Sequence, residues 1–432
     1  MMRRVIAAAM LFAACALHAQ KHPAHTTQPQ EPAPIVQAES AIDQQHWPAA
    51  EAILRKLVAA SPKDARAWFD LGYVMHARQN YPEAIAAYRG AVAAEPENFE
   101  CNLNLGLMLA HEGQPDASKY LEKATHLKPT AEHPQESMAR AWSALAQVQE
   151  KAAPAAALAS WAQAAALTPG DAASHLAYGD ALERAGDITS AEREFRKAAE
   201  LQPDSTDALA ALSNLFMRTQ RMPEAETALR KFVASAPQNE VAHLQLGRTL
   251  AVEKKDPEAI VELQIALSLR PDDWQALLEL AAVQERAKQY AEAEKSYRAL
   301  LAHSPGDADL HNGLGAVLLP QLKYAEAQNE FLACIRLKPE WGESYGQLAL
   351  AASGNKQYEL AIKALDARKK LLPELPSSYF LRATCYDHLR LFAEAVVNYK
   401  AFLAVSNGQF PNEEWEARHR LIAIEPEARK KK

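Results

Sequence analysis

Apolar residues recur along most of the chain at intervals of three and four, which is the spacing of one face of an α-helix. Residues 175–203, HLAYGDALERAGDITSAEREFRKAAELQP, show this pattern twice, on either side of a turn at Ala185-Gly186-Asp187. The residues that share one face of each predicted helix are His175, Tyr178, Gly179 and Leu182 in the first and Ala191, Phe195 and Ala198 in the second. The segment therefore predicts a helical hairpin whose two inner faces meet.

Prolines end the hairpins at a regular interval, because proline lacks the N–H and the φ freedom that a continuing helix requires. Seven of them are spaced by 34 residues, at positions 169, 203, 237, 271, 305, 339 and 373, and Pro62 and Pro96 keep the same spacing. Good N-cap residues follow two positions later at Asp64, Asn98, Asp171, Ser205, Asn239, Asp273 and Asp307. Trp341 and Leu375 break this rule, so helix starts are less well marked there.

Small residues within each hairpin have packing roles. Gly179 and Ala191 allow the two helices to approach, and Phe195 fills the space between them. Ala198 leaves room for the next hairpin, and Pro203 ends the segment before Ser205 starts another. A period held over this distance indicates a solenoid of stacked hairpins.

The unit resembles the tetratricopeptide repeat, whose 34-residue pattern is W-x2-L-G-x2-Y followed by alanine, an aromatic residue, alanine and proline. The clearest copy is Trp68, Leu71, Gly72, Met75, Ala84, Tyr88, Ala91 and Pro96. Eleven repeats are predicted over residues 35–407. The resemblance implies an all-α fold, a tetratricopeptide-repeat solenoid in which antiparallel helix pairs form a right-handed superhelix.

Sequence outside the repeats is scarce. Residues 1–19 have two arginines, an apolar run and small residues, the order of a signal peptide that directs export to the periplasm or out of the cell. Phe12-Ala13-Ala14-Cys15 resembles a lipobox, so lipidation of Cys15 is the alternative, giving an envelope lipoprotein that acts in assembly of a membrane or secretion complex. No later segment has the length and apolarity of a transmembrane span.

Three other segments lie outside the repeat pattern. Residues 20–34 have the proline- and glutamine-rich composition of a linker, and residues 130–138 are expected to form a loop at one rim. Residues 408–432 predict a capping helix and a basic tail, with Trp415 and Ile422 covering the end of the stack.

Composition narrows the function. Hydrophobic residues make up 49% of the chain and charged residues 23%, a composition typical of globular proteins. The formal net charge of -7 argues against nucleic acid as a partner. Cys101, Cys334 and Cys385 are too few and too widely spaced for a disulfide framework, and Cys334 reads as a buried small hydrophobe.

Catalytic and metal motifs are missing from the sequence. No block of about 100 residues remains for a catalytic domain, and neither a phosphate-binding glycine loop nor a G-x-S-x-G elbow occurs. His175, His243 and His311 recur in alternate repeats, about 20 Å apart by helix spacing, which is too far to share a zinc ion. We expect no enzymatic activity, no cofactor and no metal site.

The resemblance also implies which positions face a ligand: two, five, nine, twelve and thirteen of each repeat, counted from Ala65 in the second repeat. Positions five and nine include Ser143 and Gln147, and four arginines, Arg184, Arg218, Arg248 and Arg286, are candidates to bind acidic groups. The candidate partner-binding residues on the concave face are Phe69, Tyr73, Leu103, Leu107, Leu176, Asp180, Asn214, Leu244, Arg248 and Leu278. For the leucines 176, 244 and 278, ordinary packing is an equal alternative.

The family's clamp for chaperone C-termini pairs lysine at position five with asparagine at position nine of one repeat. No repeat here has both, since Asn214 is paired with Ala210. The sequence thus predicts a scaffold that binds protein or peptide partners, but not through that clamp.

Overall fold

The computed structural model describes residues 33–430, and within that range the chain folds into α-helices joined by short turns, without a strand. The predicted all-α fold is confirmed. The predicted signal peptide, Cys15 and nearly all of the linker lie outside the described residues. The chain forms two compact units, Met1–Thr219 and Gln220–Lys432, which are called the N-terminal and C-terminal units below.

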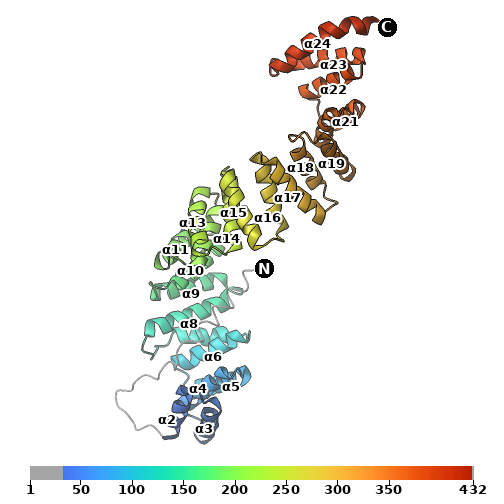
Figure 1. The fold of residues 1–432 in the computed structure, drawn as a ribbon. Helices are drawn as coiled ribbons and strands as arrows, with labels where there is room; N and C mark the ends of the chain where they lie inside the picture. Colours follow the sequence, from blue (N-terminus) through green and yellow to red (C-terminus); the bar gives the residue numbers. More distant parts are fainter. Residues whose placement is uncertain (1–32, 431–432) are drawn as a thin grey trace. The chain divides into compact units, whose positions relative to one another are not determined.

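Helices follow one another in pairs in the N-terminal unit, each beside the next in the chain (Figure 1). Their bounds are α2 (Ala33–Asp43), α3 (Trp47–Ala60), α4 (Ala65–Ala77), α5 (Tyr81–Ala94), α6 (Phe99–His111), α7 (Ala117–Thr125), α8 (Pro134–Gln149), α9 (Pro154–Leu167), α10 (Ala172–Ala185), α11 (Ile188–Leu201) and α12 (Thr206–Arg218).

The C-terminal unit continues the same arrangement and ends on a single long helix. Its helices are α13 (Met222–Ser235), α14 (Glu240–Val252), α15 (Asp256–Leu269), α16 (Trp274–Arg286), α17 (Tyr290–His303), α18 (Ala308–Leu318), α19 (Tyr324–Leu337), α20 (Gly342–Gly354), α21 (Tyr358–Leu371), α22 (Pro376–His388), α23 (Phe392–Val405) and α24 (Pro411–Lys430).

Side-chain caps start the first helices where the sequence predicts them. All seven N-cap residues accept a hydrogen bond from an amide in the first turn, as Asp64 Oδ1 does from Ala67 N at 3.1 Å. Trp341 and Leu375 make no such bond. Both the rule and its two exceptions are confirmed.

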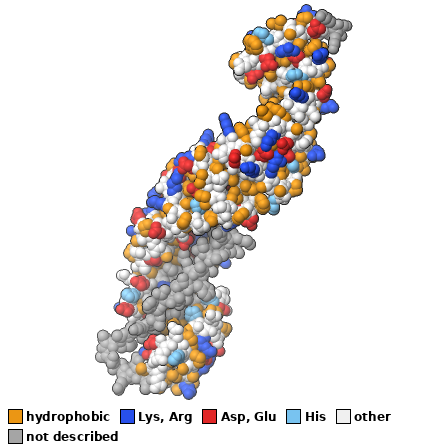
Figure 2. Space-filling model, in the orientation of Figure 1, with side chains coloured by type: hydrophobic (Ala, Val, Ile, Leu, Met, Phe, Trp, Pro, Cys, Tyr) orange, Lys and Arg blue, Asp and Glu red, His pale blue; other side chains and the backbone are white. Residues whose placement is uncertain are grey.

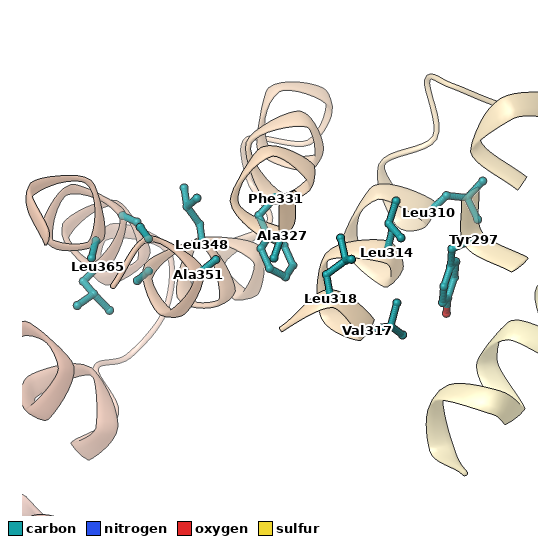
Figure 3. Packing of buried hydrophobic residues seen from close by; sticks show 14 of the residues in the cluster. Tyr297, Leu310, Leu314, Val317, Leu318, Ala327, Phe331, Leu348, Ala351 and Leu365 are labelled. Atoms are coloured by element: carbon teal, nitrogen blue, oxygen red, sulfur yellow. The ribbon is translucent and has the colours of Figure 1, made fainter. Parts of the chain in front are cut away.

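Close helix contacts in the hairpins depend on small residues, as predicted. A Cβ atom on Gly179 would lie 2.5 Å from Cε1 of Phe195, and one on Gly72 would lie 2.7 Å from Cδ1 of Tyr88. Ala191 and Ala198 are fully buried. In the C-terminal unit the same packing gives a continuous core, in which Phe331 and Leu314 point into the space between neighbouring helices (Figure 3).

In each described hairpin except α8–α9, the turn between the two helices contains a residue in the left-handed conformation. Glycine takes this place at Gly113 (φ 64°) and Gly186 (φ 86°). Other residues take it elsewhere with φ between 57° and 62°: Gln45, Gln79, Gln220, Lys254, Lys288, Leu322, Lys356 and Arg390.

A side chain at position four of several repeats binds the carbonyl oxygen of the proline that ends the previous repeat. The donor is Trp68 Nε1 for Pro62 and Asn102 Nδ2 for Pro96, each at 3.0 Å. The other four pairs are His175 with Pro169, His243 with Pro237, His311 with Pro305, and Tyr345 with Pro339. The three histidines therefore replace the usual aromatic residue, as predicted.

Each of these histidines also has a second partner, which is a glutamate. Nδ1 lies 2.8 Å from Glu194 in the case of His175, and 2.6 Å from Glu262 in the case of His243. His311 has the same relation to Glu330 at 2.6 Å. The imidazole thus joins the two helices of its hairpin to the turn before them.

Ion pairs link successive repeats at the surface. In the C-terminal unit Glu226 accepts hydrogen bonds from Lys255 Nζ at 2.7 Å and from Arg230 Nη2 at 2.7 Å. Arg230 Nη2 also lies 2.6 Å from Glu258 in the next repeat. On the face of this unit that Figure 2 shows, acidic and basic side chains are accordingly interspersed.

Two sequence predictions need correction. The loop expected over residues 130–138 ends earlier, because α8 begins at Pro134, whose missing N–H is tolerated in the first turn of a helix. Trp415 and Ile422 do not cover the stack, since they are 63% and 75% exposed. Ala417 and Ile424 lie on the opposite face of α24 and pack against Phe402 and its neighbours instead.

Candidate functional site

A groove in the N-terminal unit is a candidate site, with a volume of about 900 Å³. Its walls come from the first helices of four successive repeats, α4, α6, α8 and α10, together with residues 132–136 and the turn before α10. Leu107, Met108 and Ala144 are buried side chains that give it an apolar part. This size matches the clefts in which proteins bind ligands.

The groove is lined by the repeat positions that the family resemblance assigns to a ligand. Leu107 and Gln147 are at position nine and Ser143 is at position five. Three further ligand-facing positions add polar groups to the lining: Arg140 at position two, His76 at position twelve and His111 at position thirteen. The 34-residue repeat numbering of the sequence also assigns these three residues to ligand-facing positions.

The four arginines singled out from the sequence are already neutralised. Arg184 Nη2 lies 2.7 Å from Glu150, and Arg218 Nη1 lies 2.5 Å from Glu183. The remaining two pairs are Arg248 with Glu279 and Arg286 with Asp256. Each arginine pairs with a carboxylate of a neighbouring repeat, so its role is to join repeats.

Arg140 differs from them. It is half-buried at the start of α8, and within residues 33–430 it forms neither an ion pair nor a hydrogen bond through its side chain. Its guanidinium therefore places in the groove a positive charge that no residue from 33 to 430 pairs with.

Aromatic and imidazole rings lie close to it. The Tyr81 ring centre is 4.6 Å from that of His111 and 6.1 Å from that of His76. His111 Nδ1 lies 2.9 Å from Glu112. Burial lowers the pKa of His76, and electrostatic interaction with His111 and Arg140 lowers it further. His76 is accordingly held neutral near pH 7, able both to donate and to accept a hydrogen bond.

The segment between α7 and α8 is fixed against the groove rim. The backbone N–H and the hydroxyl of Thr130 each donate to Glu100 Oε1 at 2.8 Å. Glu100 is in the first turn of α6, so the segment is attached to a helix that lines the groove. Glu132 and His133 reach the rim from this attached segment.

Of the ten candidate residues, Leu107 alone lines this groove. Leu103 is 1% exposed and packs in a core cluster with Phe99 and Leu145, which corrects its assignment to the binding surface. Leu244 is 7% exposed, so packing is the better of its two interpretations. At these two residues, position five is therefore a packing position.

The other candidates are half-buried and make contacts inside the fold. Phe69 packs edge-on against Tyr88, and Tyr73 packs edge-on against Trp47. Leu176 and Leu278 rest against core clusters, whereas Arg248 is paired as described above. Asp180 and Asn214 are half-buried on α10 and α12.

Three cysteines lie in the described part of the chain. Cys101, Cys334 and Cys385 are buried free thiols there, and burial raises the pKa of Cys101 to about 12, which makes it a poor nucleophile. No cluster of three or more His, Cys, Asp or Glu residues in this range is arranged to hold a metal ion. Of the helices described, none combines the length and the apolarity needed to cross a membrane.

A sequence model of the tetratricopeptide repeat matches the chain repeatedly. The matched residues are 35–99, 76–132, 150–206, 176–240, 244–308 and 286–340, which together span more than half of the 432 residues. No curated protein matches the sequence.

Solved structures of similar fold have low sequence identity to the chain. One is YrrB, described as a tetratricopeptide-repeat protein with an unusual peptide-binding site, at 20% identity and TM-score 0.39, covering 45% of this chain and 97% of YrrB. A MamA fragment from Desulfovibrio magneticus RS-1 has 20% identity and TM-score 0.36, covering 38% and 94%. The Cut9-Hcn1 hetero-tetramer of the APC/C has 14% identity and TM-score 0.37, covering 95% and 98%.

Proposed function

The chain belongs to the tetratricopeptide-repeat family and has the all-α solenoid fold of that family, and from this premise we propose that it is a non-enzymatic scaffold. It binds an extended segment of a partner protein in the groove between α4, α6, α8 and α10. The observation that carries the proposal is the groove itself, which combines buried apolar side chains with polar groups at positions that project from successive first helices.

An extended peptide fits this arrangement for a geometric reason. The lining includes residues from the first helices of four successive repeats, so it is spread along the direction in which the repeats stack. A peptide along that direction meets Leu107 and Met108 with apolar side chains and Ser143 and Gln147 with its backbone amides.

Filling the groove tests this function. Ser143 and Gln147 are half-buried in the groove wall, so Ser143→Trp and Gln147→Trp place an indole in the ligand space without removing a core side chain. Leu350→Trp is the control, because Leu350 also stands at position nine but is 49% exposed in the C-terminal unit.

Cross-linking followed by mass spectrometry, with the full chain as bait, measures partner capture. Both groove variants should lose partners that the wild type and Leu350→Trp retain. Equal capture by all four proteins would show that this groove is not the binding surface.

We further propose that the scaffold works outside the cytoplasm, in the periplasm or secreted. The support is the order of charged, apolar and small residues in the first 19 positions. Intact mass of the mature protein tests it: a chain that starts at Gln20 supports simple cleavage, whereas a lipid-modified chain that starts at Cys15 supports an envelope lipoprotein acting in complex assembly. A full-length mature chain contradicts both.

A further inference from the structure

Helix α24, the last helix of the C-terminal unit (Figure 1), has an apolar stripe that is exposed to solvent. The stripe consists of exposed residues at intervals of four, three and four: Trp415, His419, Ile422 and Pro426. Trp415 and Ile422 are 63% and 75% exposed, and no other helix described between residues 33 and 430 has two large apolar side chains exposed to this extent. The opposite face of α24, with Ala417 and Ile424, already packs on the fold.

We propose that this stripe is a self-association surface, which pairs α24 with the α24 of a second copy of the chain in antiparallel orientation. Intervals of four and three residues keep apolar side chains along one side of a helix, as in the seam between two packed helices. A single face that binds its own copy forms a closed two-fold dimer. The surface belongs to the C-terminal unit, so it does not depend on what the groove of the N-terminal unit binds.

The apolar contact of this dimer is centred on an aromatic surface. The ring centres of Trp415 and His419 lie 3.9 Å apart, and His419 Nδ1 donates to the carbonyl oxygen of Trp415 at 2.8 Å. The imidazole is therefore held against the indole, beside the side chain of Ile422. In the antiparallel pair, His419 lies opposite Ile422 of the partner subunit, and Trp415 lies opposite Pro426 of the partner subunit. Each copy thus covers the exposed indole of the other.

Charges beside the stripe favour the antiparallel orientation. Arg418 and Glu425 stand on the same flank of the stripe, seven residues apart. Antiparallel pairing sets Arg418 against Glu425 of the partner subunit, and the two-fold axis repeats this contact. The macrodipoles of two antiparallel helices also place unlike ends together.

Both charged groups have capacity for this contact. Arg418 is 64% exposed and binds Glu414 of its own helix through Nη2 at 3.0 Å, so other N–H groups of its guanidinium can donate across the dimer. Glu425 is 30% exposed and accepts from Lys400 through Oε1 at 2.5 Å. Its second oxygen can accept a further hydrogen bond.

The size of the surface sets the strength of the dimer. Helix α24 has 20 residues, which is a length of about 30 Å at ~1.5 Å per residue. One face of such a helix is smaller than the ~1,200–2,000 Å² that a stable protein–protein interface buries. The dimer is therefore expected to be weak and to dissociate on dilution.

Sedimentation velocity of the full chain over a wide range of concentrations tests the surface. The wild type should shift from monomer to dimer as its concentration rises. Ile422→Ala should raise the dissociation constant about tenfold or more, because the dimer loses two apolar side chains from its centre. Val252→Ala is the control, since Val252 is 63% exposed on α14, and it should dimerise like the wild type.

Charge reversal tests the orientation. Arg418→Glu sets two pairs of carboxylates against each other in its own dimer, and Glu425→Arg sets two pairs of guanidinium groups against each other. Each variant alone should dimerise about tenfold or more weakly than the wild type. Mixed in equal amounts, they should form heterodimers with wild-type affinity, because both contacts then join opposite charges. Circular dichroism checks that each variant keeps its helical fold.

Four outcomes contradict the proposal. A wild type that stays monomeric at every concentration overturns it. Association that Ile422→Ala leaves unchanged also overturns it, because another part of the chain then carries the contact. Mixed charge variants that associate no better than either alone exclude the antiparallel pair. A monomer that floats with phosphatidylglycerol vesicles, and loses this binding in Ile422→Ala, would assign the stripe to a membrane surface instead.

Discussion

Leu322 lies in a hairpin turn with a φ of 59°, in the left-handed region that side chains with a Cβ atom rarely adopt. The turn imposes this conformation, because Lys323 N donates to Leu318 O at 3.2 Å and closes the end of the first helix. In the fifth repeat Gly186 occupies the same place without a Cβ clash. The two residues therefore form a natural comparison of strained and unstrained turns.

Leu322→Gly should raise the free energy of unfolding by roughly 0.5–1 kcal/mol. Glycine removes the energetic cost of the left-handed conformation, and this gain is partly offset because glycine loses more backbone entropy on folding. Gly186→Leu should lower it by about 1–2 kcal/mol. Urea unfolding followed by circular dichroism measures both. Leu322→Ala is the control: it removes the exposed leucine but keeps the Cβ atom, so stabilisation by alanine equal to that by glycine would contradict the backbone explanation.

The conformation of most turn residues could not be predicted from the sequence. Gly186 marked its turn, but Lys254, Lys288 and Leu322 gave no local signal, because hydrogen bonding in the hairpin overrides their own preference for negative φ. The same limit applies to the groove. The repeat register places Arg140 at a ligand-facing position. Whether another residue of the described range 33–430 pairs with it depends on which carboxylates adjacent repeats bring near it, and the register does not contain that information.

Hairpins as elements were largely predictable, since the prolines, the caps and the small residues at helix contacts repeat in the sequence. The hydrogen bonds that join the two helices of a hairpin could not be predicted in the same way. His243 donates from Nε2 to the carbonyl of Pro237 at 3.1 Å, and its Nδ1 lies 2.6 Å from Glu262 on the second helix. Its side chain is 5% exposed and that of Glu262 is 19% exposed, so the contact between them is largely shielded from water.

His243→Leu should lower the free energy of unfolding by about 1–3 kcal/mol, because it leaves the Pro237 carbonyl and the Glu262 carboxylate without a donor. His243→Asn should cost less, since Asn102 fills the corresponding place with an amide donor in the third repeat. Thermal unfolding ranks the variants. A leucine variant as stable as the asparagine variant would mean that volume, not hydrogen bonding, matters at this position.

Ion pairs between repeats predict a pH dependence. The hydrogen bond from Lys255, aided by that from Arg230, lowers the pKa of Glu226 to about 2 from 4.5. A carboxyl group whose pKa is lower in the folded state stabilises the fold above its unfolded pKa, and this stabilisation is lost as the pH falls from 4.5 towards 2.

Glu226→Gln should therefore lower the free energy of unfolding by about 1 kcal/mol at pH 7, a magnitude typical of partly exposed pairs, and by much less near pH 2.5. Urea unfolding at both pH values measures the difference. Glu292→Gln, at an exposed glutamate on α17, is the control and should change little at either pH. A Glu226→Gln effect that does not depend on pH would contradict the ion-pair explanation.

At the scale of the whole molecule, each unit is built from contacts between near neighbours in the chain. In the N-terminal unit the extensively packed helix pairs are one or two helices apart, such as α10 with α9, α11 and α12. Long-range contacts of the kind found in a globular core do not connect α10 with α4 or α5. A disturbance in one hairpin is therefore expected to decay over one or two repeats.

Gly179→Ala tests this decay, because the added Cβ atom would meet Phe195 and must displace it. Hydrogen exchange measured by mass spectrometry should increase in α9 to α12 and stay unchanged in α4 and α5. Gly306→Ala is the control, since a Cβ atom there meets nothing within 4 Å. Increased exchange in α4 and α5 would indicate a unit that opens as a whole.

The bond from position four to the preceding proline carbonyl has a consequence for how the repeats are compared. The acceptor is a main-chain oxygen, so the site requires a proton on a nitrogen or oxygen at the right distance and nothing more. An indole, an amide, an imidazole and a phenol all meet that requirement here. Trp68, Asn102, His243 and Tyr345 differ in size and chemical type. They are nevertheless equivalent at this position, because each donates a hydrogen bond to the equivalent backbone carbonyl. Classifying position four only by whether its side chain is a hydrogen-bond donor would therefore align repeats that a comparison of residue types fails to align.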